Sequence, residues 1–122
     1  MKKKLSIITG GSSGFGLASA QCLADKTALL LCARGEAGLA AAKKELETYG
    51  AEVYTFCIDV SDEDSVRGCA QYAASLGEIV NVIHAAGVSP ANTTAKEILR
   101  INAMGPIYIT EHFRPLLAEG GV

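Results

Sequence analysis

A glycine-rich segment lies between the first apolar run of the chain and a stretch rich in alanine. It spans residues 9–16 (TGGSSGFG), follows the apolar residues 5–8 and precedes residues 17–24 (LASAQCLA). This order predicts a strand, a glycine turn and a helix start. Glycine leaves room for a phosphate to approach the backbone, and the N–H groups that begin the helix favour an anion.

The segment therefore predicts a site for the pyrophosphate of a dinucleotide. A flexible glycine-serine turn without a ligand is the alternative, and the position between a strand and a helix makes it the weaker interpretation. We expect the contacts to come from Thr9, Gly10, Ser12, Ser13, Gly14, Phe15 and Gly16.

Four apolar runs alternate with three amphipathic stretches along the 122 residues. The runs at 28–33 and 79–84 are almost continuously apolar, which is typical of parallel strands covered on both faces. Short connections and right-handed crossovers then predict an α/β fold, a doubly wound parallel sheet with strand order 3-2-1-4 in one domain over residues 1–122. The predicted strands are 5–9, 28–33, 53–58 and 79–84, and the predicted helices are 15–24, 36–49 and 61–76.

Caps are predicted at two helix starts. Ser61 has the spacing of a capping box, and the acidic residues that follow it favour the helix dipole. Thr94 offers a similar cap for a further helix, which Gly105-Pro106 either restarts or bends.

Composition excludes several classes of partner. The formal net charge of −2 offers nothing to a nucleic acid, and no apolar run approaches the length of a membrane span. Lys2-Lys3-Lys4 is followed by too short an apolar run for a signal peptide, so we expect a cytoplasmic protein. The two histidines, His84 and His112, are isolated in the sequence, and we assign no metal. The four cysteines are expected to be reduced and buried, namely Cys22, Cys32, Cys57 and Cys69.

The spacing Thr-Gly-x-x-x-Gly-x-Gly resembles the cofactor loop of the short-chain dehydrogenase/reductase (SDR) family, and the resemblance extends over the whole chain. It implies a Rossmann-type fold and hydride transfer between a nicotinamide cofactor and a small carbonyl or alcohol substrate. Asp59 and Val60 are similar to the adenine-contacting segment of the family. Alternatively Asp59 caps the helix near Ser61, and both roles can hold together.

Two further segments carry the resemblance. His84-Ala85-Ala86-Gly87 stands where the family has Asn-Asn-Ala-Gly, and only Ala86 and Gly87 keep that pattern. The small residues Ala85, Ala86 and Gly87 would let the backbone approach the cofactor ribose. We expect His84 to be a buried, hydrogen-bonded histidine rather than a catalytic one.

Asn102 is similar to the asparagine that, in the family, holds a water in the proton relay to the catalytic lysine. Alternatively, it bends its helix and makes only local hydrogen bonds. It is the one catalytic position of the family that we find in this chain.

The end of the second predicted strand indicates which cofactor is used. Family members that prefer NAD place an acidic residue there, about twenty residues past the glycines. Here that place is taken by Ala33, and Arg34 follows it. A guanidinium suits a ribose 2′-phosphate through paired charged hydrogen bonds. We therefore expect a preference for NADP(H), with NAD(H) possible, and interpret the nearby Glu36 as a helix-start residue.

The family's catalytic Tyr-x-x-x-Lys is missing from this sequence, and its catalytic serine would lie on a fifth strand. The chain thus resembles the first half of an SDR enzyme, truncated before the fifth strand. We expect no turnover by the chain alone, and assembly as a homo-oligomer or with a complementing polypeptide. A non-catalytic dinucleotide-binding module and a half-subunit without activity of its own remain alternatives. The residues four positions after Tyr49, Tyr54, Tyr72 and Tyr108 are Val53, Ile58, Leu76 and His112.

Overall fold

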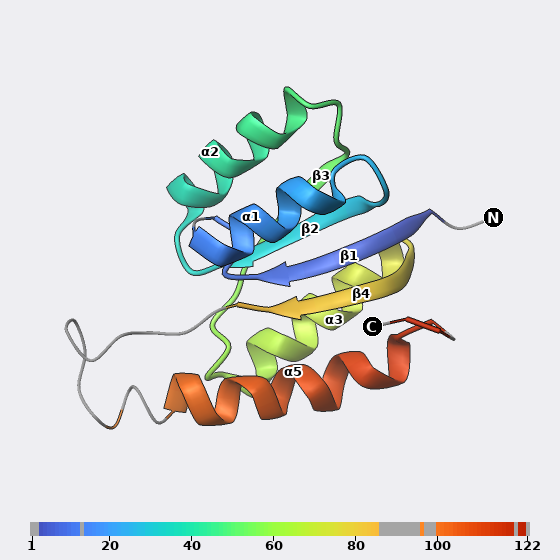
Figure 1. The fold of residues 1–122 in the computed structure, drawn as a ribbon. Coiled ribbons are helices and arrows are strands. Elements are labelled where there is room, and N and C mark those ends of the chain that lie inside the picture. Colours follow the sequence, from blue (N-terminus) through green and yellow to red (C-terminus); the bar gives the residue numbers. More distant parts are fainter. Residues whose placement is uncertain (1–2, 13, 86–95, 97–99, 119, 122) are drawn as a thin grey trace.

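The fold is a parallel sheet flanked by helices, and a computed structural model describes residues 3–12, 14–85, 96, 100–118 and 120–121 (Figure 1). The strand order is β3-β2-β1-β4, and every pairing is parallel. The predicted fold class and strand order are confirmed. The strands are β1 (Lys4–Thr9), β2 (Ala28–Ala33), β3 (Val53–Cys57) and β4 (Glu78–His84).

Helices lie on both faces of the sheet (Figure 1). One face is covered by α1 (Gly14–Leu23) and α2 (Glu36–Glu47), and the other by α3 (Glu63–Leu76) and α5 (Gly105–Phe113). Alternate residues of the central strands point to the two helical layers, so each strand serves two cores. In β2, for example, Leu29 and Leu31 pack with the α1/α2 layer, whereas Leu30 and Cys32 pack with the α3/α5 layer.

The start of α3 differs from the prediction. Its N-cap is Asp62, whose carboxylate accepts a hydrogen bond from the backbone N–H of Asp64 at 3.0 Å. Ser61 instead donates through both its N–H and its hydroxyl to the Asp59 carboxylate. The Asp62 side chain is therefore the N-cap of α3, and the capping box predicted at Ser61 is wrong. The cap predicted at Thr94 lies outside the described residues.

The prediction that all four cysteines are buried is wrong for two of them. Cys32 and Cys69 are fully buried, with their sulfurs 3.4 Å apart, but Cys22 and Cys57 are exposed. Cys22 faces away from the side of α1 that buries Ala20, and Cys57 ends a strand at the edge of the sheet. None of the helices in the described residues has the length and apolar composition needed to cross a lipid bilayer.

Candidate functional site

The glycine loop connects β1 to α1 at the carboxyl edge of the sheet. Gly10 and Gly14 have φ angles of 68° and 56°, a left-handed conformation that other residues rarely adopt. The Gly10 N–H donates to the Cys32 carbonyl at 2.7 Å, which fixes the start of the loop against the end of β2. The loop therefore has a defined backbone path rather than that of a loose connection.

Gly16 sits where α1 comes closest to this loop. A Cβ atom placed on Gly16 would lie 2.0 Å from the carbonyl oxygen of Gly10, far inside van der Waals contact. A Cβ on Gly14 would meet nothing within 4 Å, so that position is restricted by its backbone conformation alone. The first turn of α1 can reach the loop only because residue 16 has no side chain.

The other loop residues named from the sequence have different surroundings. Thr9 is fully buried, Ser12 is half-buried against α2, and the Phe15 side chain is 76% exposed. Ser13 lies outside the described residues.

The carboxyl ends of β1 and β4 are joined side by side. Thr9 and His84 are register partners, and their Oγ1 and Nδ1 atoms are 2.7 Å apart. The N–H of Ala85 donates to the Thr9 carbonyl at 3.1 Å, which extends the pairing past β4. The sheet order reverses between these two strands, and open α/β sheets bind ligands at such a point. Ala86 and Gly87 lie outside the described residues.

His84 is half-buried and only partly satisfied. Its Nδ1 atom bonds Thr9, but its buried Nε2 atom has no hydrogen-bond partner in the described part of the structure. Burial lowers the pKa of this imidazole, because desolvation disfavours the charged ring. His84 therefore stays neutral near pH 7, and its hydrogen bond with Thr9 joins the ends of β1 and β4.

Replacing His84 with asparagine is expected to make the protein less sensitive to acid. With a folded pKa below the unfolded value of about 6.5, the unfolded state binds more protons as the pH falls through that window. His84 therefore costs stability below about pH 6.5, and asparagine removes that cost while it can still bond Thr9. Urea unfolding at pH 7.5 and pH 5 measures the effect. An equal acid loss in both proteins would contradict the assignment.

Arg34 and Asp59 come together in a pocket at the same edge of the sheet as the glycine loop. The pocket has a volume of about 290 Å³ and is open to solvent, and its lining residues come from the ends of β2 and β3 and from α3. Arg34 is exposed and Asp59 is half-buried, whereas Val60 is buried and takes part in the core. The lining residues are Arg34, Cys57, Ile58, Asp59 and Ser65.

Asp59 has a clear local role in this pocket. Its Oδ1 atom accepts hydrogen bonds from the N–H of Ser61 at 3.0 Å and from the Ser61 hydroxyl at 2.6 Å. Its own N–H donates to the Ser65 hydroxyl at 3.0 Å. The carboxylate thus fixes the turn into α3 without being its N-cap. Ser65 could not be assigned to this site from the sequence, because the turn that brings it to Asp59 cannot be inferred from spacing alone.

Asn102 lies in a π-helical turn (Arg100–Met104) that leads into α5. The residue is exposed. Single π turns are rare and occur often at functional sites, because they turn side chains away from the regular helical path. The structure does not bring Asn102 into the pocket of Arg34 and Asp59.

His112 is not isolated, as it is in the sequence. Its Nε2 atom lies 3.0 Å from a carboxylate oxygen of Glu63, and Glu111 is close by. Glu63 belongs to α3, whereas Glu111 and His112 belong to α5, and Glu63 and His112 are 49 positions apart in the sequence. Only the packing of α5 on α3 brings these side chains together.

Comparison with known proteins places this geometry among dehydrogenases. The family model described as short chain dehydrogenase matches residues 4–122. A short-chain dehydrogenase/reductase of Alternaria brassicicola is 32% identical over 111 residues, covering 91% of this chain and 40% of the relative. The chain therefore spans less than half of the length of that relative.

Two solved structures show the same fold. A short-chain dehydrogenase/reductase from Burkholderia phymatum in complex with NAD is 29% identical with a TM-score of 0.85, covering 94% of this chain and 44% of that one. An NADPH-bound short chain oxidoreductase from Pseudomonas aeruginosa PAO1, described as having an atypical catalytic center, is 30% identical. Its TM-score is 0.79, covering 93% of this chain and 48% of that one. Both kinds of nicotinamide cofactor thus occur among similar structures.

Proposed function

The chain belongs to the short-chain dehydrogenase family, and we propose on that basis that it forms the cofactor-binding half of an NADP(H)-dependent oxidoreductase. The complete enzyme would transfer a hydride between the nicotinamide and a small carbonyl or alcohol substrate. The observation that carries the proposal is the contact between loop and helix at Gly16. There, the loop that follows β1 runs directly into the first turn of α1, at the strand ends where the sheet order reverses, and a helix start at such a point favours a phosphate.

The proposed cofactor lies along the carboxyl edge of the sheet. Its pyrophosphate occupies the loop of Gly10, Gly14 and Gly16, and its adenosine extends to the pocket of Arg34 and Asp59. The ribose next to the nicotinamide follows the backbone from Ala85 onward. This path is supported by the position of the glycine loop, the pocket of Arg34 and Asp59 and the strand ends at one edge of the sheet, as Figure 1 shows for the strands.

The preference for NADP(H) rests on the charge at the end of β2. Arg34 is exposed in the adenosine pocket, and the neighbouring position carries the neutral Ala33. Glu36 opposes this preference, because its negative charge would repel a 2′-phosphate. Its carboxylate is near the pocket, since it interacts with the thiol of Cys57, a lining residue. Partial desolvation, followed by the Glu36 carboxylate, raises the pKa of the Cys57 thiol. The guanidinium lines the pocket itself, so it decides our proposal.

Replacing Arg34 with alanine is expected to weaken NADPH binding by about 2 kcal/mol, since a charged hydrogen-bond pair to the 2′-phosphate is lost. That corresponds to about a 30-fold rise in Kd, while NADH binding should change little. Calorimetric titration of both cofactors measures the two values.

Two variants serve as controls for this titration. Arg67→Ala removes an exposed arginine that bonds Asp64 on α3, outside the pocket, and should leave both affinities unchanged. Glu36→Gln should leave NADH binding unchanged. If that variant instead weakened NADH selectively, Glu36 would hold the ribose hydroxyls and the proposed preference would be wrong.

Asn102 is the proposed contribution of this chain to catalysis. In the complete enzyme it would hold a water of the proton relay, and its π-helical turn supports a specialised role. The tyrosine, lysine and serine of the family would come from outside these 122 residues. A complementing polypeptide would supply them next to β4, where Val82, Ile109 and Phe113 line an open cavity of about 200 Å³. A homo-oligomer is the other proposed assembly, but it would bring only further copies of the same 122 residues.

A non-catalytic dinucleotide-binding module is the second candidate. It is supported by the glycine loop and the pocket of Arg34 and Asp59, which suffice for dinucleotide binding without any catalytic residue. The two candidates predict the same cofactor binding but differ in turnover after complementation.

A further inference from the structure

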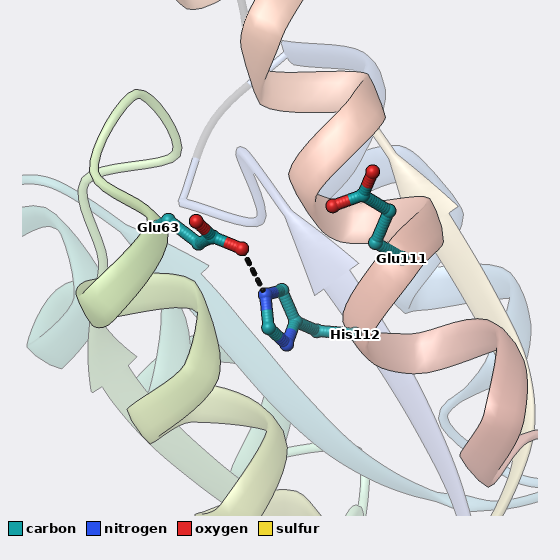
Figure 2. A group of neighbouring side chains, drawn as sticks. All are labelled: Glu63, Glu111 and His112. Atoms are coloured by element: carbon teal, nitrogen blue, oxygen red, sulfur yellow. Dashed lines mark hydrogen bonds and ion pairs between the residues drawn. The ribbon is translucent and has the colours of Figure 1, made fainter.

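Two carboxylates and one imidazole meet between α3 and α5 (Figure 2). Glu63 is the first residue of α3, and Glu111 and His112 are neighbours near the end of α5. One ligand atom from each residue can be chosen so that all three lie within 4.8 Å of one another. None of the three belongs to the glycine loop or to the pocket of Arg34 and Asp59.

We propose that Glu63, Glu111 and His112 bind a divalent transition-metal ion of the Zn²⁺ type. One imidazole nitrogen and two carboxylate oxygens form a donor set that Zn²⁺ accepts, and three protein ligands leave a position for water. Ligand bonds of about 2.1 Å place tetrahedral donors about 3.4 Å apart. The 3.0 Å between His112 Nε2 and Glu63 Oε2 is already close to that separation, and Glu111, whose ligand atom lies within 4.8 Å of the other two, would complete the site by rotating its exposed side chain toward them.

The two helices hold these donors in a fixed arrangement. Val66 and Cys69 of α3 pack in the same core cluster as Ile109 and Phe113 of α5. The His112 ring is only 20% exposed, whereas the Glu63 side chain is 44% exposed. The imidazole is therefore held in place by its surroundings, and the carboxylates remain free to adjust to an ion.

The local charges favour a cation. The site holds two carboxylates, and the nearby Arg67 bonds Asp64, the neighbour of Glu63. Glu111 and His112 lie in the last turn of α5, where the helix dipole is negative, whereas Glu63 lies at the start of α3, where the dipole is positive, so the attraction for a cation comes from the two carboxylates. A bound ion would reduce the repulsion between Glu63 and Glu111 and would link the two helices.

Exposed thiols compete for Zn²⁺, so the test uses purified protein in which Cys22 and Cys57 are replaced by serine. Calorimetric titration with Zn²⁺ is expected to show one site. Removing a residue that only hydrogen-bonds to a metal ligand typically lowers metal affinity about 10–100-fold. Because His112 and Glu63 would bind the ion directly, His112→Gln and Glu63→Gln should each lower the affinity about 100-fold. Co²⁺ as a second probe should give visible absorption bands that disappear in His112→Gln.

Two further variants decide between a metal site and a simple contact. Glu111→Gln alters an exposed side chain outside the His112–Glu63 hydrogen bond, and its affinity for Zn²⁺ should fall at least about tenfold. Glu47→Gln changes an exposed glutamate of α2 and should leave binding unchanged. Circular dichroism checks that each variant is folded. Binding weaker than about 1 mM, or binding that Glu111→Gln leaves intact, would reduce the cluster to a helix–helix hydrogen bond and overturn the proposal.

Discussion

Replacing Gly16 with alanine is expected to weaken cofactor binding about 100-fold and to destabilise the protein. The new Cβ atom would lie 2.0 Å from the Gly10 carbonyl oxygen and 2.6 Å from its carbon, and both are backbone atoms that cannot rotate away. The first turn of α1 must then separate from the loop. Such overpacking costs about 1–3 kcal/mol of stability. Two lost hydrogen bonds to phosphate, at about 1.5 kcal/mol each, weaken binding by about 100-fold.

The matched control is another glycine-to-alanine change, in α3. A Cβ on Gly68 would make an ordinary 3.7 Å contact with Phe56, so Gly68→Ala should stabilise the helix by about 0.5–1 kcal/mol and leave binding alone. Urea unfolding and NADPH titration of both variants test the pair. A Gly16→Ala protein that is folded and binds NADPH like the parent would show that the loop is not the phosphate site.

A polypeptide of these 122 residues is expected to show no detectable dehydrogenase turnover. General acid–base catalysis contributes roughly two to four orders of magnitude in rate. The tyrosine and lysine that supply it in the family are missing here, because no tyrosine of this chain is followed by a lysine four residues later. Positioning of the reactants contributes as much as about 7–11 kcal/mol of the barrier. The segment that would hold the nicotinamide against a substrate is not among the residues we can assign.

The assay follows NADPH absorbance with a panel of ketones, and NADP with a panel of alcohols. It is run with the chain alone and with a polypeptide that supplies the second half of a related dehydrogenase. Turnover that appears only in the mixture, and that falls in an Asn102→Ala variant, would support the half-enzyme. Strong turnover by the chain alone would mean that catalytic residues were misplaced. Cofactor binding without turnover in any mixture would favour the dinucleotide-binding module.

The fold was predictable because strand and helix patterns alternate regularly. Continuous apolar runs such as residues 28–33 indicate strands buried on two faces, and the doubly wound arrangement of dinucleotide-binding folds then predicts the observed order β3-β2-β1-β4. Element ends were less predictable. The start of α3 depends on whether Ser61 or Asp62 accepts the capping bond, and that is decided by the engagement of Ser61 with Asp59.

The candidate site was predictable in its loop and less so in its side chains. Glycine spacing marks the loop, because only glycine satisfies its backbone angles and its contact with α1. Thr9 and His84 are 75 positions apart in the sequence, and the hydrogen bond between them depends on the register of β1 and β4. The meeting of Glu63 and His112 depends on how α5 packs against α3. Contacts of this kind have no local signal in the sequence.

The central position of β1 determines the order in which this sheet can assemble during synthesis. The β1–β2 and β2–β3 pairings are available once residue 57 has emerged, together with the apolar layer beneath α1 and α2. The other edge of β1 must wait for β4, as the Ser6–Asn81 hydrogen bond across 75 residues illustrates. Such non-local pairing slows folding, and an unpaired central strand can capture a neighbouring chain. The nascent protein is therefore most prone to aggregate between the completion of β3 and the arrival of β4.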